Sequence, residues 1–325
     1  MPIDTDSLSD KYRPLLVDSS KKRILISKIE GSGQEADLTK RPNASGLGRI
    51  HNFRRQGSAR WVENPLPIEP ACAFLRLERR NSITAQVFQN AACNWRCWYC
   101  YVPFDMLGAL PGKSEWATVD QLVDAYARLE DRPPILDLSG GQPELSPEWV
   151  LWTMSALERA GIDKSTYLWS DDNLSNDYFW RHLTAQERER IVAYPGYGKV
   201  GCFKGFDESS FAFNTEAAKD LFDRQFELFD RYVKEGLDIY AYVTFTHPDE
   251  GSLMPAMERF VDRLQMIDHE LPARTIPLEI SAYGPVQGRL DDRRRWAMEV
   301  GQYRALDAWQ EVLLSRRLGS GGVHE

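Results

Sequence analysis

The stretch ITAQVFQNAACNWRCWYC, residues 83–100, joins a strand-like segment to a cluster of cysteines. Its first six residues are mostly β-branched or aromatic, which predicts a short β-strand. Three of the five cysteines of the chain follow, at positions 93, 97 and 100. Because disulfides need pairs, this odd number predicts metal-ligating or core thiols.

Strand-like and helix-like segments alternate from this stretch onward. We expect strands at residues 83–88, 134–139, 166–171, 199–203, 239–246 and 276–281. We expect helices at residues 118–130, 146–160, 176–192, 215–236, 252–267 and 293–317. Ser146-Pro147 and Asn214-Thr215 have the composition of helix starts. Six strand–helix units predict an α/β fold with a parallel sheet, either a partial barrel or an open, doubly wound sheet.

The chain divides into three parts by composition. Residues 1–80 are rich in Gly, Ser, Asn and Pro and contain one strand-like segment, RILISKI at 23–29, so we expect an irregular N-terminal extension. Residues 81–290 hold the strand–helix units. Residues 291–325 are expected to form a C-terminal helix and tail.

The bulk composition is that of a soluble globular protein, with 42% hydrophobic and 27% charged residues among 325. No signal peptide and no apolar run of about 18 residues is visible, so we expect a cytoplasmic protein without membrane contact. The net charge of −8 disfavours avid nucleic-acid binding. Basic residues gather within 21–60. They form either a solvated surface or a contact for an acidic partner such as RNA.

The spacing of the three cysteines admits three interpretations. The i, i+4, i+7 pattern suits a helical stripe, although Pro103 would end such a helix early. A structural zinc site would need a fourth ligand from Cys72, His51 or Cys202. The third interpretation is an iron–sulfur cluster held by three thiolates, which leaves one iron open to an outside ligand.

The pattern Cys-x3-Cys-x2-Cys after the first strand, with Tyr99 before the third cysteine, resembles the motif of radical S-adenosylmethionine (SAM) enzymes. The resemblance implies a [4Fe-4S] cluster on Cys93, Cys97 and Cys100, with SAM bound to its open iron. It also implies reductive cleavage of SAM to a 5′-deoxyadenosyl radical that abstracts a hydrogen atom from substrate. The family fold is a partial (β/α)6 TIM-like barrel, which agrees with the six units.

The second expected strand ends in LDLSGGQPEL, which resembles the family's Gly-Gly-Glu-Pro motif. The resemblance implies that Gly140, Gly141 and Gln142 receive the amino group of SAM. Glycine lets the backbone turn sharply and approach a ligand closely. Gln142 replaces the acid of the motif, so the charge of a carboxylate is missing here.

Polar residues at the next strand ends are further cofactor candidates. Ser170 and Asp172 should share a strand face, and the resemblance implies contact with the ribose or carboxylate of SAM; helix capping is the alternative. Lys204 is similar to a basic residue that faces the cofactor carboxylate, or it is a surface lysine. The resemblance further implies that Tyr99 lies beside the adenine.

Four residues are weaker candidates for the substrate pocket. Cys202 is either a core residue or a partner of the radical. His247, Tyr283 and Gln287 follow the last two expected strands, where structural roles are also common. Cys72 is expected in the core, and Trp95 and Trp98 are expected to shield the cluster.

The last cysteine is Cys202, so we expect one cluster and no auxiliary one. The expected reaction is hydrogen abstraction from a small-molecule or peptide substrate, with an external flavodoxin- or ferredoxin-like electron donor. A glycyl-radical activase and an RNA-modifying enzyme are alternatives within the family. A zinc-stabilised binding module is the alternative from another class.

Overall fold

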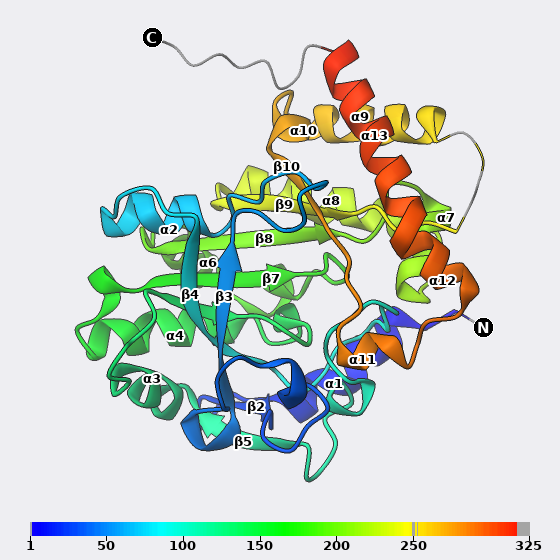
Figure 1. Cartoon of the computed structure of the whole chain (residues 1–325). Coiled ribbons are helices and arrows are strands. Elements are labelled where there is room, and N and C mark those ends of the chain that lie inside the picture. The colour runs from blue at the N-terminus through cyan, green and yellow to red at the C-terminus, as the bar shows by residue number, and fades with distance from the viewer. Residues whose placement is uncertain (1, 249–250, 252, 317–325) are drawn as a thin grey trace.

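The computed structural model describes residues 2–248, 251 and 253–316. The main sheet has seven strands in the order β10-β9-β8-β7-β6-β4-β3 and curls into a half-barrel (Figure 1). These strands are β3 Gly48–Arg54, β4 Ser82–Phe88, β6 Ile135–Leu138, β7 Tyr167–Asp172, β8 Tyr197–Phe203, β9 Ile239–Thr244 and β10 Thr275–Leu278.

The six strands from β4 to β10 are parallel, and β3 joins β4 antiparallel as a seventh strand. The partial TIM-like barrel that the family resemblance implies is confirmed, whereas the alternation alone leaves an open, doubly wound sheet as an alternative. In Figure 1 the arrows of β7 and β8 point toward the side on which α7, α11 and α12 lie. Loops that leave the carboxyl ends of the parallel strands therefore meet on that side, where ligands of such folds bind.

Helices cover the outer face of the sheet. They are α3 Val119–Ala127, α4 Glu148–Arg159, α5 Tyr178–His182, α6 Ala185–Val192, α7 Glu208–Thr215, α8 Leu221–Glu235 and α9 Met254–Ile267. Outward strand residues such as Leu138, Leu168 and Phe203 pack with these helices in one large core. The concave face carries a second apolar cluster, which includes Trp169 and Tyr242. Alternating strand residues thus separate two environments.

Two predicted helix starts are wrong. Asn214 and Thr215 lie at the end of α7, which begins after Asp207, whose side chain accepts from the Ser210 N–H; Glu216 then ends the helix at a φ of 62°. The first residue before α4 is Pro147 rather than Ser146. A local contact is the reason at Ser146, because its hydroxyl donates to the Pro143 carbonyl within the preceding turn.

The helix expected over 176–192 is split in two. Thr184 begins α6 with a capping box, in which its hydroxyl accepts from the Glu187 N–H and the Glu187 carboxylate accepts from the Thr184 N–H. Such a reciprocal cap is a strong local start signal. The chain therefore turns between α5 and α6 instead of continuing as one helix.

The N-terminal 80 residues are more regular than their composition indicates. They contain α1 Thr5–Leu16, β1 Val17–Asp18, β2 Arg23–Ser27, β3 and α2 Ile68–Leu75. The predicted strand at β2 is confirmed, and it pairs with β1 and with β5 Ser114–Thr118 in a second sheet. Strand β3 was missed because its partner lies in another part of the chain, which local composition does not reveal.

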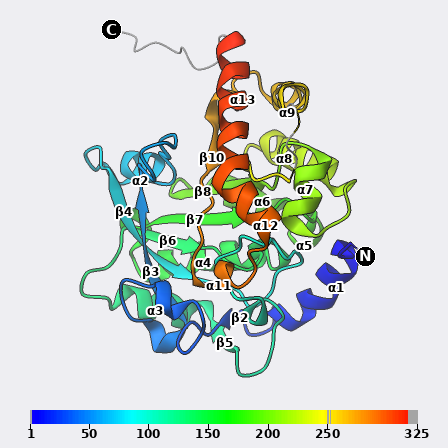
Figure 2. The ribbon, with the colours of Figure 1, turned by 45° about the vertical axis from the view of Figure 1, so that its right-hand side comes forward.

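The C-terminal segment returns across the sheet and ends in a long helix. It comprises α10 Leu271–Arg274, α11 Gly284–Gln287, α12 Asp292–Trp296, a π-helical turn at Ala297–Gly301 and α13 Gln302–Ser315. Figure 2 shows α12 and α13 as one nearly continuous column beside α9. The predicted helix at 293–317 is confirmed up to Ser315. Residue 252, the first of the helix predicted over 252–267, and residue 317, the last of this one, lie outside the described residues.

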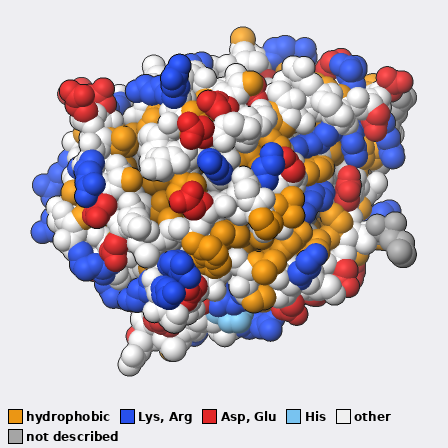
Figure 3. Space-filling view, turned by 90° about the horizontal axis from the view of Figure 1, so that it is seen from below, with side chains coloured by type: hydrophobic (Ala, Val, Ile, Leu, Met, Phe, Trp, Pro, Cys, Tyr) orange, Lys and Arg blue, Asp and Glu red, His pale blue; other side chains and the backbone are white. Residues whose placement is uncertain are grey.

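One face of the molecule carries an extended apolar area. Seen from below, apolar side chains gather in a broad group bordered by Lys and Arg (Figure 3). Within the described part of the chain, every helix is too short or too polar to cross a membrane.

Candidate functional site

The cysteine segment is an irregular loop at the carboxyl end of β4. Residues 93–100 contain no helical turn, so the interpretation as a helical stripe is wrong. All three thiols are half-buried. The Cys100 N–H donates to the Cys97 carbonyl at 2.9 Å, which folds the second half of the loop into a turn.

The three thiols lie within electrostatic reach of one another. The pKa of Cys97 is raised to about 12, mainly by burial; Lys204 opposes this rise, and negative charge on Cys93 or Cys100 adds to it. Burial also raises the pKa of Cys100, and Arg289 and Lys204 oppose this. In the described residues no three His, Cys, Asp or Glu side chains already converge as a metal site. Three thiols on one loop are nevertheless the type of ligand that iron–sulfur clusters use.

The first half of the loop is anchored by buried neutral side chains. The Asn94 amide donates to the Ser9 and Ser175 hydroxyls at 2.8 and 2.7 Å. The Trp95 indole donates to the Thr5 hydroxyl at 2.9 Å. Each of these five side chains is at most 2% exposed. Helix α1 thereby fixes the segment that carries Cys93.

Arg96 closes the same half from the surface side. Its guanidinium donates to the carbonyls of Cys93 and Trp95 at 2.6 and 2.8 Å. It also donates to the Tyr12 hydroxyl at 3.1 Å. These bonds satisfy loop carbonyls that no regular secondary structure pairs.

The second half of the loop is anchored by the C-terminal segment. The Arg289 guanidinium donates to the carbonyls of Cys100 and Val102 at 2.6 and 2.9 Å. It lies 3.6 Å from the centre of the Phe104 ring, a cation–π contact. The Tyr99 hydroxyl is 3.1 Å from the Thr244 hydroxyl at the end of β9.

The two tryptophans of the loop lie in the protein core. Trp95 packs edge-on against Phe211 with ring centres 5.2 Å apart. Trp98 is fully buried, and its indole donates to the Asn214 side chain at 3.1 Å. It shares an apolar cluster with Val286 and Ala297 of the C-terminal segment. Both rings thus exclude water from the interior side of the loop.

The Gly140-Gly141 turn lies against the beginning of the cysteine loop. The two glycines have φ values of +87° and +67°, and a Cβ at Gly141 would lie 2.0 Å from the Asn90 side-chain oxygen. Glycine is required there on both grounds. The Gln142 N–H donates to the Ala92 carbonyl at 2.8 Å, which joins the turn to the residue before Cys93.

The side chains of Gln142, Asp172 and Ser170 are buried behind this turn. The Gln142 amide donates to Asp172 at 2.8 Å, and its oxygen accepts from the Asn173 N–H at 3.0 Å. Ser170 pairs with the Tyr197 hydroxyl at 2.8 Å. Ser170 and Asp172 share a strand face, as expected, and it is the face toward the helices.

Asp171 lies on the opposite, concave face and was missed by the sequence argument. Burial raises the pKa of Asp171 to about 6, and Lys204 is the largest opposing influence. The negative charge of Asp171 also raises the pKa of Asp137 beyond the effect of burial, so both carboxyls face the same space. The alternation with Trp169 along β7 was the available signal, because Trp169 belongs to the concave cluster.

The half-buried Lys204 follows β8 and is the cation common to this region. Its positive charge lowers the pKa of Cys97, Tyr99, Cys202 and Asp171 against the larger effect of burial. The structure therefore brings Lys204 to the cysteine loop and to Asp171.

The weaker candidates are scattered. Cys202 and Cys72 lie in the apolar cluster of the concave face. His247 is 1% exposed, and its Nε2 is 3.0 Å from the Gly301 carbonyl. Tyr283 is 51% exposed and immediately precedes α11, and the exposed Gln287 is the last residue of that helix.

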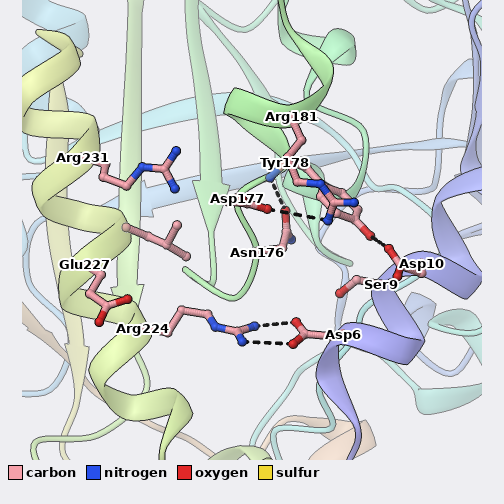
Figure 4. A pocket seen from close by; sticks show the side chains of 11 residues that line it. Asp6, Ser9, Asp10, Asn176, Asp177, Tyr178, Arg181, Arg224, Glu227 and Arg231 are labelled. Carbon is pink, nitrogen blue, oxygen red and sulfur yellow. Dashed lines mark hydrogen bonds and ion pairs between the residues drawn. The ribbon is translucent and has the colours of Figure 1, made fainter.

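A separate open pocket of about 310 Å³ lies between α1, α5 and α8. Figure 4 shows charged side chains from the three elements around it, with Arg224 and Asp6 paired across its lower part. Ser9 contributes to its wall and also accepts from Asn94. The pocket thus lies behind the first half of the cysteine loop.

No family model and no curated protein matches the sequence. SuiB from Streptococcus suis is similar at 13% identity and a TM-score of 0.38, over 56% of this chain and 36% of that one. SuiB bound to precursor peptide SuiA is similar at 13% and 0.44, over 71% and 46%. A histidine-tagged anSMEcpe with bound AdoMet is similar at 12% and 0.35, over 58% and 59%. The chain spans less than two thirds of the length of each of these structures.

Proposed function

We propose that this chain is a radical SAM enzyme in which Cys93, Cys97 and Cys100 hold a [4Fe-4S] cluster. Such a cluster supplies the electron that cleaves SAM to a 5′-deoxyadenosyl radical, the agent of hydrogen abstraction from substrate. One observation carries the proposal: three half-buried thiols lie on an ordered loop at the carboxyl end of the first parallel strand, tied directly to a Gly-Gly turn.

The other residues have complementary roles in this proposal. The turn at Gly140 and Gly141 leaves bare backbone for the amino group of SAM, because no Cβ fits there. Lys204 supplies positive charge for the carboxylate of SAM, and Tyr99 contacts the adenine. In this proposal Asp171 is the hydrogen-bond acceptor for SAM on the concave face, because the side chains of Ser170 and Asp172 point toward the helices.

The substrate is a small molecule or a peptide that enters the concave side of the half-barrel. An external flavodoxin- or ferredoxin-like protein supplies electrons in the cytoplasm. In this proposal the chain still divides into an N-terminal part (1–80), a core (81–290) and a C-terminal part (291–325). The N-terminal part also contributes to the core, because its strand β3 pairs with β4 and completes the main sheet.

The test is anaerobic reconstitution followed by metal analysis and reaction with SAM. We expect about four irons with matching sulfide per chain and 5′-deoxyadenosine after reduction, detected by mass spectrometry. C97A should lose both, whereas C72S and C202S should keep the iron, because those thiols lie in the apolar cluster. One zinc per chain, or a fully loaded cluster without 5′-deoxyadenosine, contradicts the proposal.

A further inference from the structure

Gln142 stands where the related motif has a glutamate, and its surroundings explain the difference. Its side chain is 1% exposed and both of its polar atoms are engaged. The amide nitrogen donates to Asp172 at 2.8 Å, while the amide oxygen accepts from the Asn173 N–H at 3.0 Å. An amide donates and accepts in this way without carrying charge at any pH, whereas a carboxyl does so only while it is protonated.

The site around Gln142 already contains more acid than base. Lys199 forms an ion pair with Glu144 and lies 3.9 Å from Asp172, and all three side chains are at most 1% exposed. Asp172 also accepts from the Tyr232 hydroxyl and the Leu174 N–H, both at 2.8 Å. Two buried carboxylates therefore share one ammonium. A glutamate at 142 would place a third carboxylate against Asp172, which is strongly unfavourable away from water.

The same network reaches the cysteine loop. The Asn173 side chain donates to the Asn94 side chain at 3.0 Å and lies 3.8 Å from the Cys93 sulfur. The Gln142 N–H holds the Ala92 carbonyl. Gln142 thus links β7, the Gly-Gly turn and the start of the cysteine loop.

We propose that Gln142 is a positioning residue. Its neutral amide locks the Gly140-Gly141 turn to Asp172 and, through Asn173, holds Cys93 in place. The side chain at 142 acts through these neighbours and does not contact SAM, so the amino group of SAM meets the turn backbone alone. The last statement rests on the proposed function; the positioning role does not.

The test is the pH dependence of unfolding of Q142E, measured on the cluster-free protein. In its protonated form, the carboxyl that Q142E introduces donates to Asp172 as the amide does, so Q142E should match the wild type only at about pH 4 and below, where a carboxyl of ordinary pKa is also largely protonated in the unfolded chain. As the pH rises, burial and the acidic surroundings keep this carboxyl protonated in the folded state, and stability is lost. The charged and titratable groups that face position 142 are Asp172 on β7, Glu144 after the turn, Lys199 and Tyr197 on β8, and Tyr232 on α8.

The expected signature is the slope of this loss. One proton separates the folded and unfolded forms of Q142E, so its unfolding constant relative to the wild type should rise by up to about tenfold per pH unit above pH 5. Q142M keeps the site neutral but removes both hydrogen bonds, so its loss should not depend on pH. Equal loss of Q142E at pH 5 and pH 8, or no loss at pH 8, overturns the proposal.

Alkylation of the thiols at pH 8 tests the link to Cys93. In Q142E the rate of labelling by iodoacetamide should rise several-fold at Cys93 relative to Cys100, as measured by peptide mass spectrometry. Q86E is the matched control, because Gln86 is also buried but pairs with the Asn43 amide instead of a carboxylate. Equal acceleration at Cys93 and Cys100, or the same pattern in Q86E, overturns the link. These measurements need no cluster, so failure of the proposed function shows separately in the iron content of the wild type.

Discussion

The two halves of the cysteine loop are held in different ways. Residues 93–96 are tied mainly by buried, neutral hydrogen bonds to α1 and to the turn after β7. Residues 97–102 are tied by the half-buried guanidinium of Arg289 from the C-terminal segment, by the hydrogen bonds of Trp98 to Asn214 and by the Tyr99–Thr244 hydroxyl pair. Segments from opposite ends of the chain thus clamp one short motif from its two sides.

The two halves of the loop therefore differ in how rigidly they are held and in the charges beside their thiols. A buried neutral hydrogen bond is costly to leave unmade, so the first half is rigid and closely coupled to global folding. The second half carries two of the three thiols beside the positive charges of Arg289 and Lys204, which favour thiolate against the effect of burial. We therefore expect changes in the first half to unfold the protein and changes in the second half to act locally.

The largest effect is expected for W95A. Removal of this fully buried indole leaves a cavity between α1 and α7 and should lower the free energy of unfolding by about 3–5 kcal/mol. Urea titration followed by circular dichroism measures it. M266A is the control, because Met266 is 86% exposed, and it should change stability by less than about 0.5 kcal/mol. A mild W95A would show that the first half is not coupled to global folding.

N94A should follow with a loss of about 2–3 kcal/mol, because it leaves the buried Ser9, Ser175 and Asn173 side chains with fewer partners. N52A, at an exposed position of β3, is the matched control. Hydrogen exchange should accelerate throughout the core of N94A. Acceleration confined to residues 91–96 would break the distinction between the two halves.

R289M should cost about 1–2 kcal/mol, since the half-buried guanidinium makes several bonds to carbonyls but remains partly screened by solvent. Hydrogen exchange should accelerate in peptides that cover residues 97–104 and remain unchanged over 91–96. R289K keeps the charge without the forked donor geometry and should give an intermediate result. Equal acceleration in both halves would contradict local action.

The smallest effect concerns Asp171, which faces Lys204 beside the second half. Its pKa is raised to about 6 from 3.8, so the folded state favours the protonated form and stability contributed by this group falls as the pH rises from about 4 to beyond 6. D171N should remove this fall, a difference of about 1 kcal/mol after allowance for screening of the half-buried carboxyl.

The Asp171 measurement is the difference between wild type and D171N in urea midpoint at pH 4 and pH 7. A difference is needed because His51, whose pKa is lowered to about 4 by burial, contributes in the opposite direction: its stability is lost as the pH falls from 6.5 through 4. Parallel profiles for wild type and D171N would show that Asp171 keeps its ordinary pKa.

The parallel half-barrel was predictable because its strands and helices are local patterns. The six parallel strands β4, β6, β7, β8, β9 and β10 are short, mostly apolar segments, and the crossovers between them have helical periodicity. Strand β5, which belongs to the second sheet, was not predicted. The start of the helix expected over 215–236 was predicted wrongly. The Asn214-Thr215 pair has the composition of a cap, but it lies at the end of α7, and α8 begins only at Leu221.

The amino-acid sequence alone determined the spacing of the three thiols, the position of the Gly-Gly turn and the order of both along the sheet. These features depend only on covalent distance along the chain and on backbone freedom. Tertiary structure decided which side chains face the site. It turned Ser170 and Asp172 to the helices and Asp171 to the concave face, and it engaged both polar atoms of Gln142. It also brought α1 and Arg289 to the cysteine loop from opposite ends of the chain. Such contacts form only after folding has joined distant segments, and no local pattern in the sequence encodes them.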